Sequence, residues 1–171
     1  MKEFTKAIEL RCRNADKYSQ IICKALVSCG CSAGTDSSDS DTAFVLLSGR
    51  SIGEANRDVS ADIIVFDDSF CEADEISRFR IAVTDYENAR HLEGKLSNAF
   101  TFSEEHYGAE LACRSVSRQD DGLAFDIVSG GILSRVRVKR DDLSVRDVLL
   151  CTAVLIAAGI PIASVVSCFG S

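Results

Sequence analysis

Short runs of apolar residues, separated by polar or turn-forming residues, mark the first half of the chain. The clearest are AFVLLSG at 43–49, ADIIVFDD at 61–68 and RIAVTD at 80–85. Runs that are apolar at nearly every position are typical of strands buried on both faces, as in a parallel sheet covered by helices. AFTF at 99–102 predicts a further strand, and TKAIELRC at 5–12 is compatible with a strand or a helix.

Helical periodicity is clearest in KYSQIICKALVSC at 17–29, where the apolar residues fall on one face. Gly30 follows directly and is a typical helix end. The small, polar residues at 31–42 predict a flexible loop, and residues 86–96 predict a short helix. Helices that alternate with buried strands are the pattern of an α/β domain.

The pattern changes near residue 110, where apolar and polar residues begin to alternate with a period of two. Turn-forming residues at 120–122 and 130–131 divide this region into three strands, which predicts antiparallel hairpins. A helix is predicted at 145–158, with Ser144 as its N-cap and Asp147 in a partial capping box, and a last helix follows it. The predicted fold class is α/β: a largely parallel sheet, flanked by helices, with a β-hairpin section.

Composition sets limits on function without naming one. The 171 residues, of which 46% are hydrophobic and 26% charged, predict one domain, residues 1–171, with a proper core. The formal net charge of −7 argues against a protein that coats nucleic acid, because phosphate neutralisation needs clustered Lys and Arg. A basic stripe at Arg135, Arg137 and Lys139 is interpreted as a solvated strand face, with binding of an anionic partner as the alternative.

Eight cysteines raise the question of disulfides or of a metal site. The first residues lack the apolar core of a secretory signal, so we expect a cytoplasmic protein whose thiols stay reduced. Only Cys29 and Cys31 are close in sequence, and the chain's two histidines, His91 and His106, do not complete a zinc spacing. The cysteines are therefore interpreted as small apolar core residues.

The uncharged segment at 148–171 is long enough to raise a transmembrane helix. Its Ala-Gly-Ile-Pro sequence at 158–161 combines a helix stop with a restart, and each half is then too short to span a bilayer. We therefore expect two helices packed in the core and no membrane contact.

The order of these elements, with several local matches, resembles the central ATP-binding domain of the Mur ligases, the ATP-dependent amide-bond synthetases of peptidoglycan precursor assembly. IAVTDYENARHLEGKLSNAFTF, at 81–102, is similar to a strand, short helix and strand of that domain. GLAFDIVSGGILSRVRV, at 122–138, is similar to its second hairpin, and SVRDVLLCTAVLIAAGIPIASVV, at 144–166, to its base-contacting helix. The resemblance implies a Mur ligase central-domain-like fold derived from P-loop nucleotide-binding domains.

The resemblance also implies a phosphate loop, Gly-Thr-Asn-Gly-Lys-Thr in the family, between the first strand and helix. Its glycines let backbone N–H groups wrap phosphates, while Lys and Thr reach phosphate and Mg²⁺. Residues 13–18 take that place here and read Arg-Asn-Ala-Asp-Lys-Tyr. Lys17 falls at the loop lysine, but both glycines are replaced. Asp16 puts a carboxylate at the anion-binding helix end, and Tyr18 stands in place of the metal-binding hydroxyl.

Two sets of candidate site residues follow. The resemblance implies a remnant nucleotide site made of Arg13, Asn14, Lys17 and Asp147. Asp67 and Asp68, at a strand end, are weak candidates for holding Mg²⁺, because ligands bind beyond the carboxyl ends of parallel strands. Adjacent strand residues point to opposite faces, however, which argues against their cooperation. No catalytic residue is predicted.

The missing loop features remove several parts that phosphoryl transfer needs in one place. We therefore expect a free-standing, catalytically degenerate relative of the Mur ligase central domain: a pseudoenzyme that uses no cofactor and acts as a binding or scaffolding module linked to peptidoglycan precursor metabolism. Its partner would be another protein or a second copy, and not nucleic acid. The alternative is a protein that binds a nucleotide or UDP-sugar, or an ATP-dependent ligase with a divergent phosphate loop, which would use ATP and Mg²⁺.

Overall fold

The computed structural model describes residues 5–35, 42–48, 61–67, 79–92, 96, 98–119, 122–139 and 143–169. Its strands are β1 (Lys6–Arg11), β2 (Ala33–Gly34), β3 (Phe44–Ser48), β4 (Ala61–Phe66), β5 (Phe79–Asp85), β6 (Ala99–Ser103), β7 (Leu111–Gln119), β8 (Gly122–Ser129) and β9 (Ile132–Val138). Its helices are α1 (Ala15–Ser28), α2 (Tyr86–His91), α3 (Val145–Ala157) and α4 (Ile162–Phe169).

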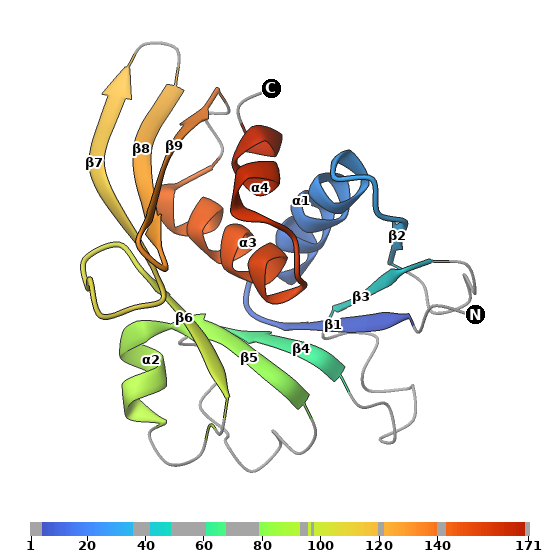
Figure 1. The fold of residues 1–171 in the computed structure, drawn as a ribbon. Helices are drawn as coiled ribbons and strands as arrows, with labels where there is room; N and C mark the ends of the chain where they lie inside the picture. The colour runs from blue at the N-terminus through green and yellow to red at the C-terminus, as the bar shows by residue number, and fades with distance from the viewer. Residues whose placement is uncertain are drawn as a thin grey trace.

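The described strands form one sheet in the order β2-β3-β1-β4-β5-β6-β7-β8-β9 (Figure 1). Pairing is parallel from β2 to β7 and antiparallel from β7 to β9. The predicted fold class, a largely parallel sheet with helices and a hairpin section, is therefore confirmed. The segment at 5–12, for which strand and helix were both possible, forms the strand β1, which lies between β3 and β4 in the sheet.

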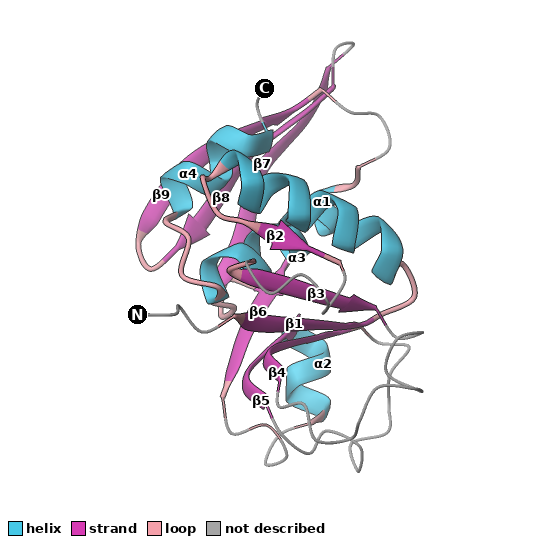
Figure 2. Ribbon diagram, turned by 90° about the vertical axis from the view of Figure 1, so that its right-hand side faces the viewer, coloured by secondary structure: helices cyan, strands magenta, loops and turns pink. Residues whose placement is uncertain are grey.

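The helices divide between the two faces of the sheet. α1, α3 and α4 lie on one face and α2 on the other (Figures 1 and 2). Val65 of β4 faces the first group and packs in one apolar cluster with Leu149 of α3. Its neighbour Ile64 faces the opposite side and packs with Leu92, just after α2. β4 is thus buried on both faces, as the apolar residues at 63–66 predict.

α3 runs through the centre of the main core. Ten of its thirteen residues are buried, and it contacts the sheet, α1 and α4. A helix that is apolar all round suits this position, because it is covered from several sides. The uncharged segment that begins at residue 148 thus forms most of α3 and then α4. Among the described residues, no helix is both long and apolar enough to cross a membrane.

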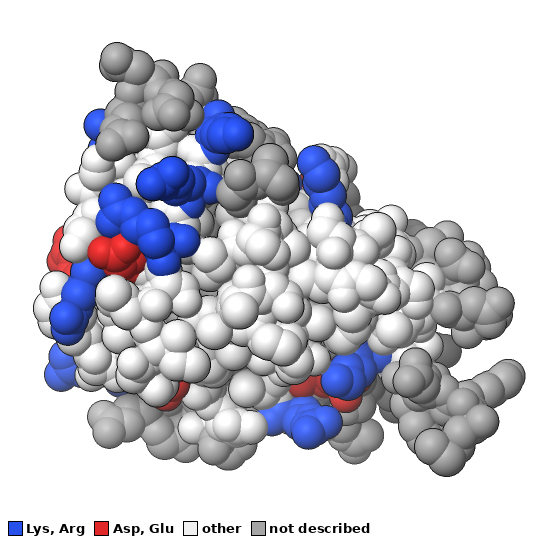
Figure 3. Space-filling view, turned by 45° about the horizontal axis from the view of Figure 1, so that its top comes forward, with Lys and Arg blue, Asp and Glu red and all other residues white. Residues whose placement is uncertain are grey.

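The hairpin section follows the period-two pattern with one irregularity. In β9, Val136 and Val138 are buried, whereas Arg135 and Arg137 on the alternate positions, and Lys139 directly after the strand, are exposed. The basic stripe therefore lies on a solvated face, and Figure 3 shows Lys and Arg gathered on this side of the molecule. The register of β7 with β8 shifts between residues 114 and 117, where a β-bulge interrupts the pairing.

Three details differ from the sequence predictions. The helix predicted to reach residue 96 ends at His91, because Leu92 leaves it and turns into the smaller apolar cluster. The loop predicted at 31–42 contains the two-residue strand β2, while residues 36–41 lie outside the described residues. All seven described cysteines are free thiols, but only Cys113 and Cys151 are fully buried. The others are half-buried, so the interpretation as core residues was too general.

Candidate functional site

The carboxyl ends of the parallel strands and the first turns of α1 and α3 come together at one edge of the sheet. β1 ends at Arg11 and α1 begins at Ala15, so only three residues connect them. Asp67 directly follows β4, and β5 ends at Asp85. In doubly wound sheets this edge is where ligands bind. The remnant-site residues and Asp67 are all found here, whereas Asp68 lies outside the described residues.

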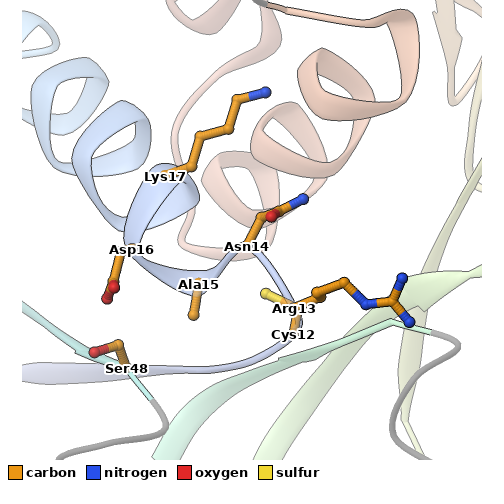
Figure 4. A pocket seen from close by; sticks show the side chains of 7 residues that line it. All are labelled: Cys12, Arg13, Asn14, Ala15, Asp16, Lys17 and Ser48. Carbon is orange, nitrogen blue, oxygen red and sulfur yellow. The ribbon is translucent and has the colours of Figure 1, made fainter.

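A pocket of about 370 Å³ opens at the start of α1. Residues 12–17 and Ser48 line it (Figure 4). Asn14 is the N-cap of α1, but its side chain makes no capping hydrogen bond. Asp16 points toward Ser48, whereas Lys17 extends away from the pocket in the direction of α3. The Asp16 carboxylate is therefore directed toward another residue that lines the pocket, whereas the Lys17 ammonium is directed out of the pocket.

Lys17 and Tyr18 converge on a single carboxylate of α3. The Lys17 ammonium donates to one oxygen of Asp147 at 2.9 Å, and the Tyr18 hydroxyl donates to the other, also at 2.9 Å. The backbone N–H of Ser144 donates to Asp147 at 2.9 Å, and the Asp147 N–H donates to the Ser144 hydroxyl at 3.1 Å, which completes a capping box. We call these four residues the α1–α3 junction.

The junction shifts the protonation equilibria of its members. Burial alone would raise the pKa of Asp147, but the hydrogen bonds from Ser144, Lys17 and Tyr18 outweigh burial and hold that pKa below its ordinary value. Burial, reinforced by the hydrogen bond to Asp147, raises the pKa of the Tyr18 hydroxyl. At neutral pH the junction is thus an aspartate with three donors, of which one is a cation.

A second carboxylate, that of Asp67, contacts the three-residue connection between β1 and α1. The backbone N–H of Arg13 donates to Asp67 at 2.9 Å. Burial, together with the negative charge of Asp67, raises the pKa of the neighbouring Cys12 thiol to about 12. In a phosphate loop, a backbone N–H at this place would donate to a phosphate. In this protein, the Arg13 N–H donates to the Asp67 side chain instead.

The first turn of α3 also contacts the end of β5. Arg146 donates to Asp85 at 2.8 Å, and its guanidinium lies 5.7 Å from the centre of the Phe102 ring. Asp85 is at the same time the N-cap of α2 and accepts from the N–H of Glu87 at 2.9 Å. Burial raises the pKa of nearby Glu104, and the positive charge of Arg146 opposes that shift.

A more exposed group, which we call the α2 edge, consists of Tyr86, Glu87 and His106. The His106 Nε2 atom lies 2.9 Å from a Glu87 oxygen, and the ring stacks at an angle over Tyr86, with centroids 5.5 Å apart. Gly108 allows this packing, because a Cβ there would lie 2.9 Å from the Tyr86 hydroxyl. The α2 edge and the α1–α3 junction both lie at the carboxyl ends of the parallel strands.

The chemistry available at this edge is limited. Within the described ranges, no group of three or more His, Cys, Asp or Glu side chains could hold a metal ion. In the same part of the chain, the His106 ring contacts a carboxylate and a tyrosine ring, and no nucleophile is hydrogen-bonded to it. The described residues at this edge form a pocket with hydrogen-bonding side chains, and among them no base is hydrogen-bonded to a nucleophile.

The described candidate residues lie at the carboxyl edge of the sheet, but the sequence did not predict the contacts among them. The structure brings Lys17 together with Asp147, and Arg13 together with Asp67, while Asn14 lines the pocket without capping α1 through its side chain. Tyr18, considered only as a poor metal ligand, is a buried donor to Asp147. A tyrosine in the first turn of an amphipathic helix indicates burial only weakly. The residues around Tyr18 do not indicate that its partner is Asp147 in α3.

Neither a protein-family model nor a curated protein matches this chain. Solved structures do. A UDP-N-acetylmuramoyl-L-alanyl-D-glutamate–2,6-diaminopimelate ligase matches with a TM-score of 0.74 and 12% identity over 97% of this chain. A folylpolyglutamate synthetase from Lactobacillus casei matches with a TM-score of 0.72 and 10% identity over 99% of this chain. A MurF ligase from Thermotoga maritima, in complex with ADP, matches with a TM-score of 0.68 and 12% identity over 95% of this chain.

These likenesses show the fold. The chain has the Mur ligase-like α/β fold that the sequence resemblance implied, which folylpolyglutamate synthetase shares. It spans only part of each similar protein: 46% of the diaminopimelate ligase, 63% of the folylpolyglutamate synthetase and 48% of the MurF ligase.

Proposed function

We propose that this domain of Mur ligase-like fold is non-catalytic and acts as a binding or scaffolding module linked to peptidoglycan precursor metabolism. The observation that carries the proposal is the α1–α3 junction. Lys17, which the resemblance places at the phosphate-loop lysine, lies 2.9 Å from Asp147, and Tyr18 donates to the same carboxylate. A lysine paired in this way is not positioned to neutralise a transferring phosphoryl group, and catalysis of that reaction rests on positioning and charge neutralisation.

The remainder of the α1 connection supports the same proposal. Asp67 accepts the backbone N–H of Arg13, and Asp16 adds a carboxylate to the first turn of α1. Both would repel a phosphate from the helix end that attracts anions in nucleotide-binding folds. Residues 12–17 contain no glycine, so each carries a Cβ where a phosphate cradle needs close backbone approach.

The proposed partner is another protein or a second copy of the chain. Large apolar side chains are exposed on the hairpin section and on α1, among them Val27, Ile132 and Leu133, and such side chains are available for protein contacts. We place this role in the cytoplasm, a reducing compartment in which the described cysteines would remain thiols. Light scattering coupled to size-exclusion chromatography would separate self-association from a different partner.

Titration calorimetry with ATP and Mg²⁺, combined with a phosphate-release assay, tests the non-catalytic assignment. We expect no saturable heat at micromolar to low-millimolar ATP and no turnover. Lys17→Met should lower the stability of the fold without changing this result. The matched variant Lys24→Met, on an exposed position of the same helix, should change neither. Micromolar binding with turnover that Lys17→Met abolishes and Lys24→Met preserves would overturn the proposal.

The alternative, a domain that still binds a nucleotide or UDP-sugar, is favoured by two observations. The 370 Å³ pocket is lined by Arg13 and Asn14, which supply side-chain donors at the start of a helix, and one similar ligase was solved with ADP. Titration with ADP and with UDP-N-acetylglucosamine tests it. Saturable binding that Arg13→Ala removes, and that Arg90→Ala on exposed α2 leaves intact, would favour the alternative over the scaffolding role.

A further inference from the structure

Two cysteines that are 139 residues apart in the chain meet where α1 and α4 end. The Sγ atoms of Cys29 and Cys168 lie 3.4 Å apart. α1 and α4 lie side by side in both ribbon views and contact each other (Figures 1 and 2). Because a disulfide has an S–S distance of about 2.05 Å, the two sulfur atoms need to approach by only about 1.4 Å to form one.

We propose that Cys29 and Cys168 form a redox-sensitive pair that closes reversibly into a disulfide and fixes α4 to α1. Both residues lie at helix ends, where the backbone can shift slightly: Cys29 is the C-cap of α1, and Cys168 lies in the last turn of α4. Both are half-buried, so small oxidants can reach them. Their closeness is a property of the tertiary fold, since nothing in the sequence around either residue indicates the other.

A metal site and a different pairing are the competing interpretations of these thiols. Cys31 is near enough to contribute to the raised pKa of Cys29. However, no group of three or more potential ligands that could hold a metal ion occurs in the described part of the chain. Cys31 follows Gly30, whose φ of 82° turns the backbone after the helix. Cys168 is the cysteine whose sulfur is in contact with that of Cys29.

The reaction needs a two-electron oxidant, and a hydroperoxide supplies it. One thiolate attacks the peroxide oxygen, the O–O bond breaks, and an alcohol or water leaves, which gives a sulfenic acid. The second thiol displaces water from that sulfur to form the disulfide, so the two thiols together lose two electrons and two protons. Burial, with the hydrogen bond to Cys168, raises the pKa of Cys29 to about 11. Attack by the Cys29 thiolate is therefore slow at neutral pH and faster as the pH rises.

Closure should stabilise the fold markedly. α4 has a single fully buried residue, Val165, and is otherwise held by half-buried contacts. A disulfide across a long stretch of chain restricts the unfolded state, and the effect grows with the length of the loop it closes. For a domain of this size we expect the melting temperature of the oxidised protein to rise by roughly 5–10 °C over that of the reduced protein.

The test treats the full chain with hydrogen peroxide or diamide and compares wild type with single serine variants. Trypsin leaves Cys29 and Cys31 on one peptide, because no Lys or Arg lies between residues 24 and 50. Variants therefore have to identify the partner. We expect an intramolecular disulfide, with a higher melting temperature that a thiol reductant reverses, in wild type and in Cys31→Ser. We expect neither change in Cys29→Ser or Cys168→Ser.

The reduced variants serve as the folding control, since their melting temperatures should stay close to that of the reduced wild type. Loss of the disulfide in Cys31→Ser, a bridge that forms only between molecules, or an oxidised wild type that melts with its reduced form would each overturn the proposal.

Discussion

Two side-chain contacts to carboxylates at the carboxyl edge of the sheet have the same length and different surroundings. At the α1–α3 junction, Lys17 lies 2.9 Å from Asp147, whose side chain is 10% exposed. At the α2 edge, His106 lies 2.9 Å from Glu87, and both side chains are 45% exposed. Distance alone would rank the two pairs as equal. Burial separates them, because water screens the exposed pair and a buried carboxylate that loses its donors is left uncompensated.

The number of partners widens the difference. Asp147 accepts from Lys17, from Tyr18 and from the backbone of Ser144, and so connects two helices while capping one of them. Glu87 contacts the ring of His106 and, more distantly, Arg90 at 3.9 Å. We therefore expect the junction to contribute to stability and the α2 edge to contribute little.

Removing the carboxylate at the junction should have the largest effect. Asp147→Ala leaves the Tyr18 hydroxyl without its acceptor, Lys17 without its counter-ion and the capping box incomplete. We expect the free energy of unfolding to fall by about 3 kcal/mol. Urea denaturation would measure it, with Asp16→Ala, an exposed first-turn aspartate, as a control that changes by less than about 0.5 kcal/mol. A loss below about 1 kcal/mol at Asp147 would contradict the structural role.

Acid should weaken the junction in a predictable direction. The folded state holds the pKa of Asp147 below its unfolded value of about 4, so its contribution is fully present above that value. The contribution is lost as the pH falls through the lower, folded pKa. The stability difference between wild type and Asp147→Asn should therefore be constant from pH 7 to about 5 and shrink below about pH 4. A difference that grows on acidification would show that the sign is wrong.

The pair of Arg146 and Asp85 is intermediate in burial between the α1–α3 junction and the α2 edge, so it tests the comparison further. Its side chains are 39% and 14% exposed, and Arg146 also contacts the Phe102 ring face. We expect Arg146→Ala to lower the free energy of unfolding by about 1 kcal/mol. Arg90→Ala, whose side chain is 65% exposed, should change it by less than a few tenths of a kcal/mol. An equal loss of unfolding free energy in the two variants would contradict the proposed dependence of stability on burial.

The smallest effect is expected at the α2 edge. Glu87→Gln keeps the size of the side chain and removes its charge, and the stability should change by less than about 0.5 kcal/mol. In the same denaturation experiment, the stability difference between wild type and the variant should change little between low and high salt. A cost above about 1 kcal/mol would mean that exposure does not distinguish the two regions.

Local patterns in the sequence were sufficient for most of the fold. Apolar runs predicted β3, β4 and β5, the period-two alternation predicted β7 to β9, and the Gly-Ile-Pro sequence separated α3 from α4. Ser144 and Asp147 were predicted to cap α3, and they form a complete capping box. These features depend on residues within a few positions of one another, where spacing along the chain determines spacing in the structure.

For the candidate site residues, the sequence predicted the edge of the sheet where they lie and not the contacts they make. Lys17 and Asp147 were both candidates, but as nucleotide contacts, and the structure pairs them with each other across 130 residues of chain. Glu87 and His106 lie on different elements, and so do Arg13 and Asp67. Such contacts depend on how helices and strand ends are brought together by the whole sheet, and no periodicity records them.

The sequence by itself determined the order of strands and helices and the apolar faces that bury them, because burial of apolar surface follows from short-range pattern. The tertiary structure decided which charged, hydroxyl and thiol groups meet. Lys17 and Tyr18 could have faced a pocket, and they face α3 instead. Cys29 could have paired with Cys31, and it lies against Cys168. Directional contacts of this kind need positions fixed in three dimensions, and only the packed fold supplies them.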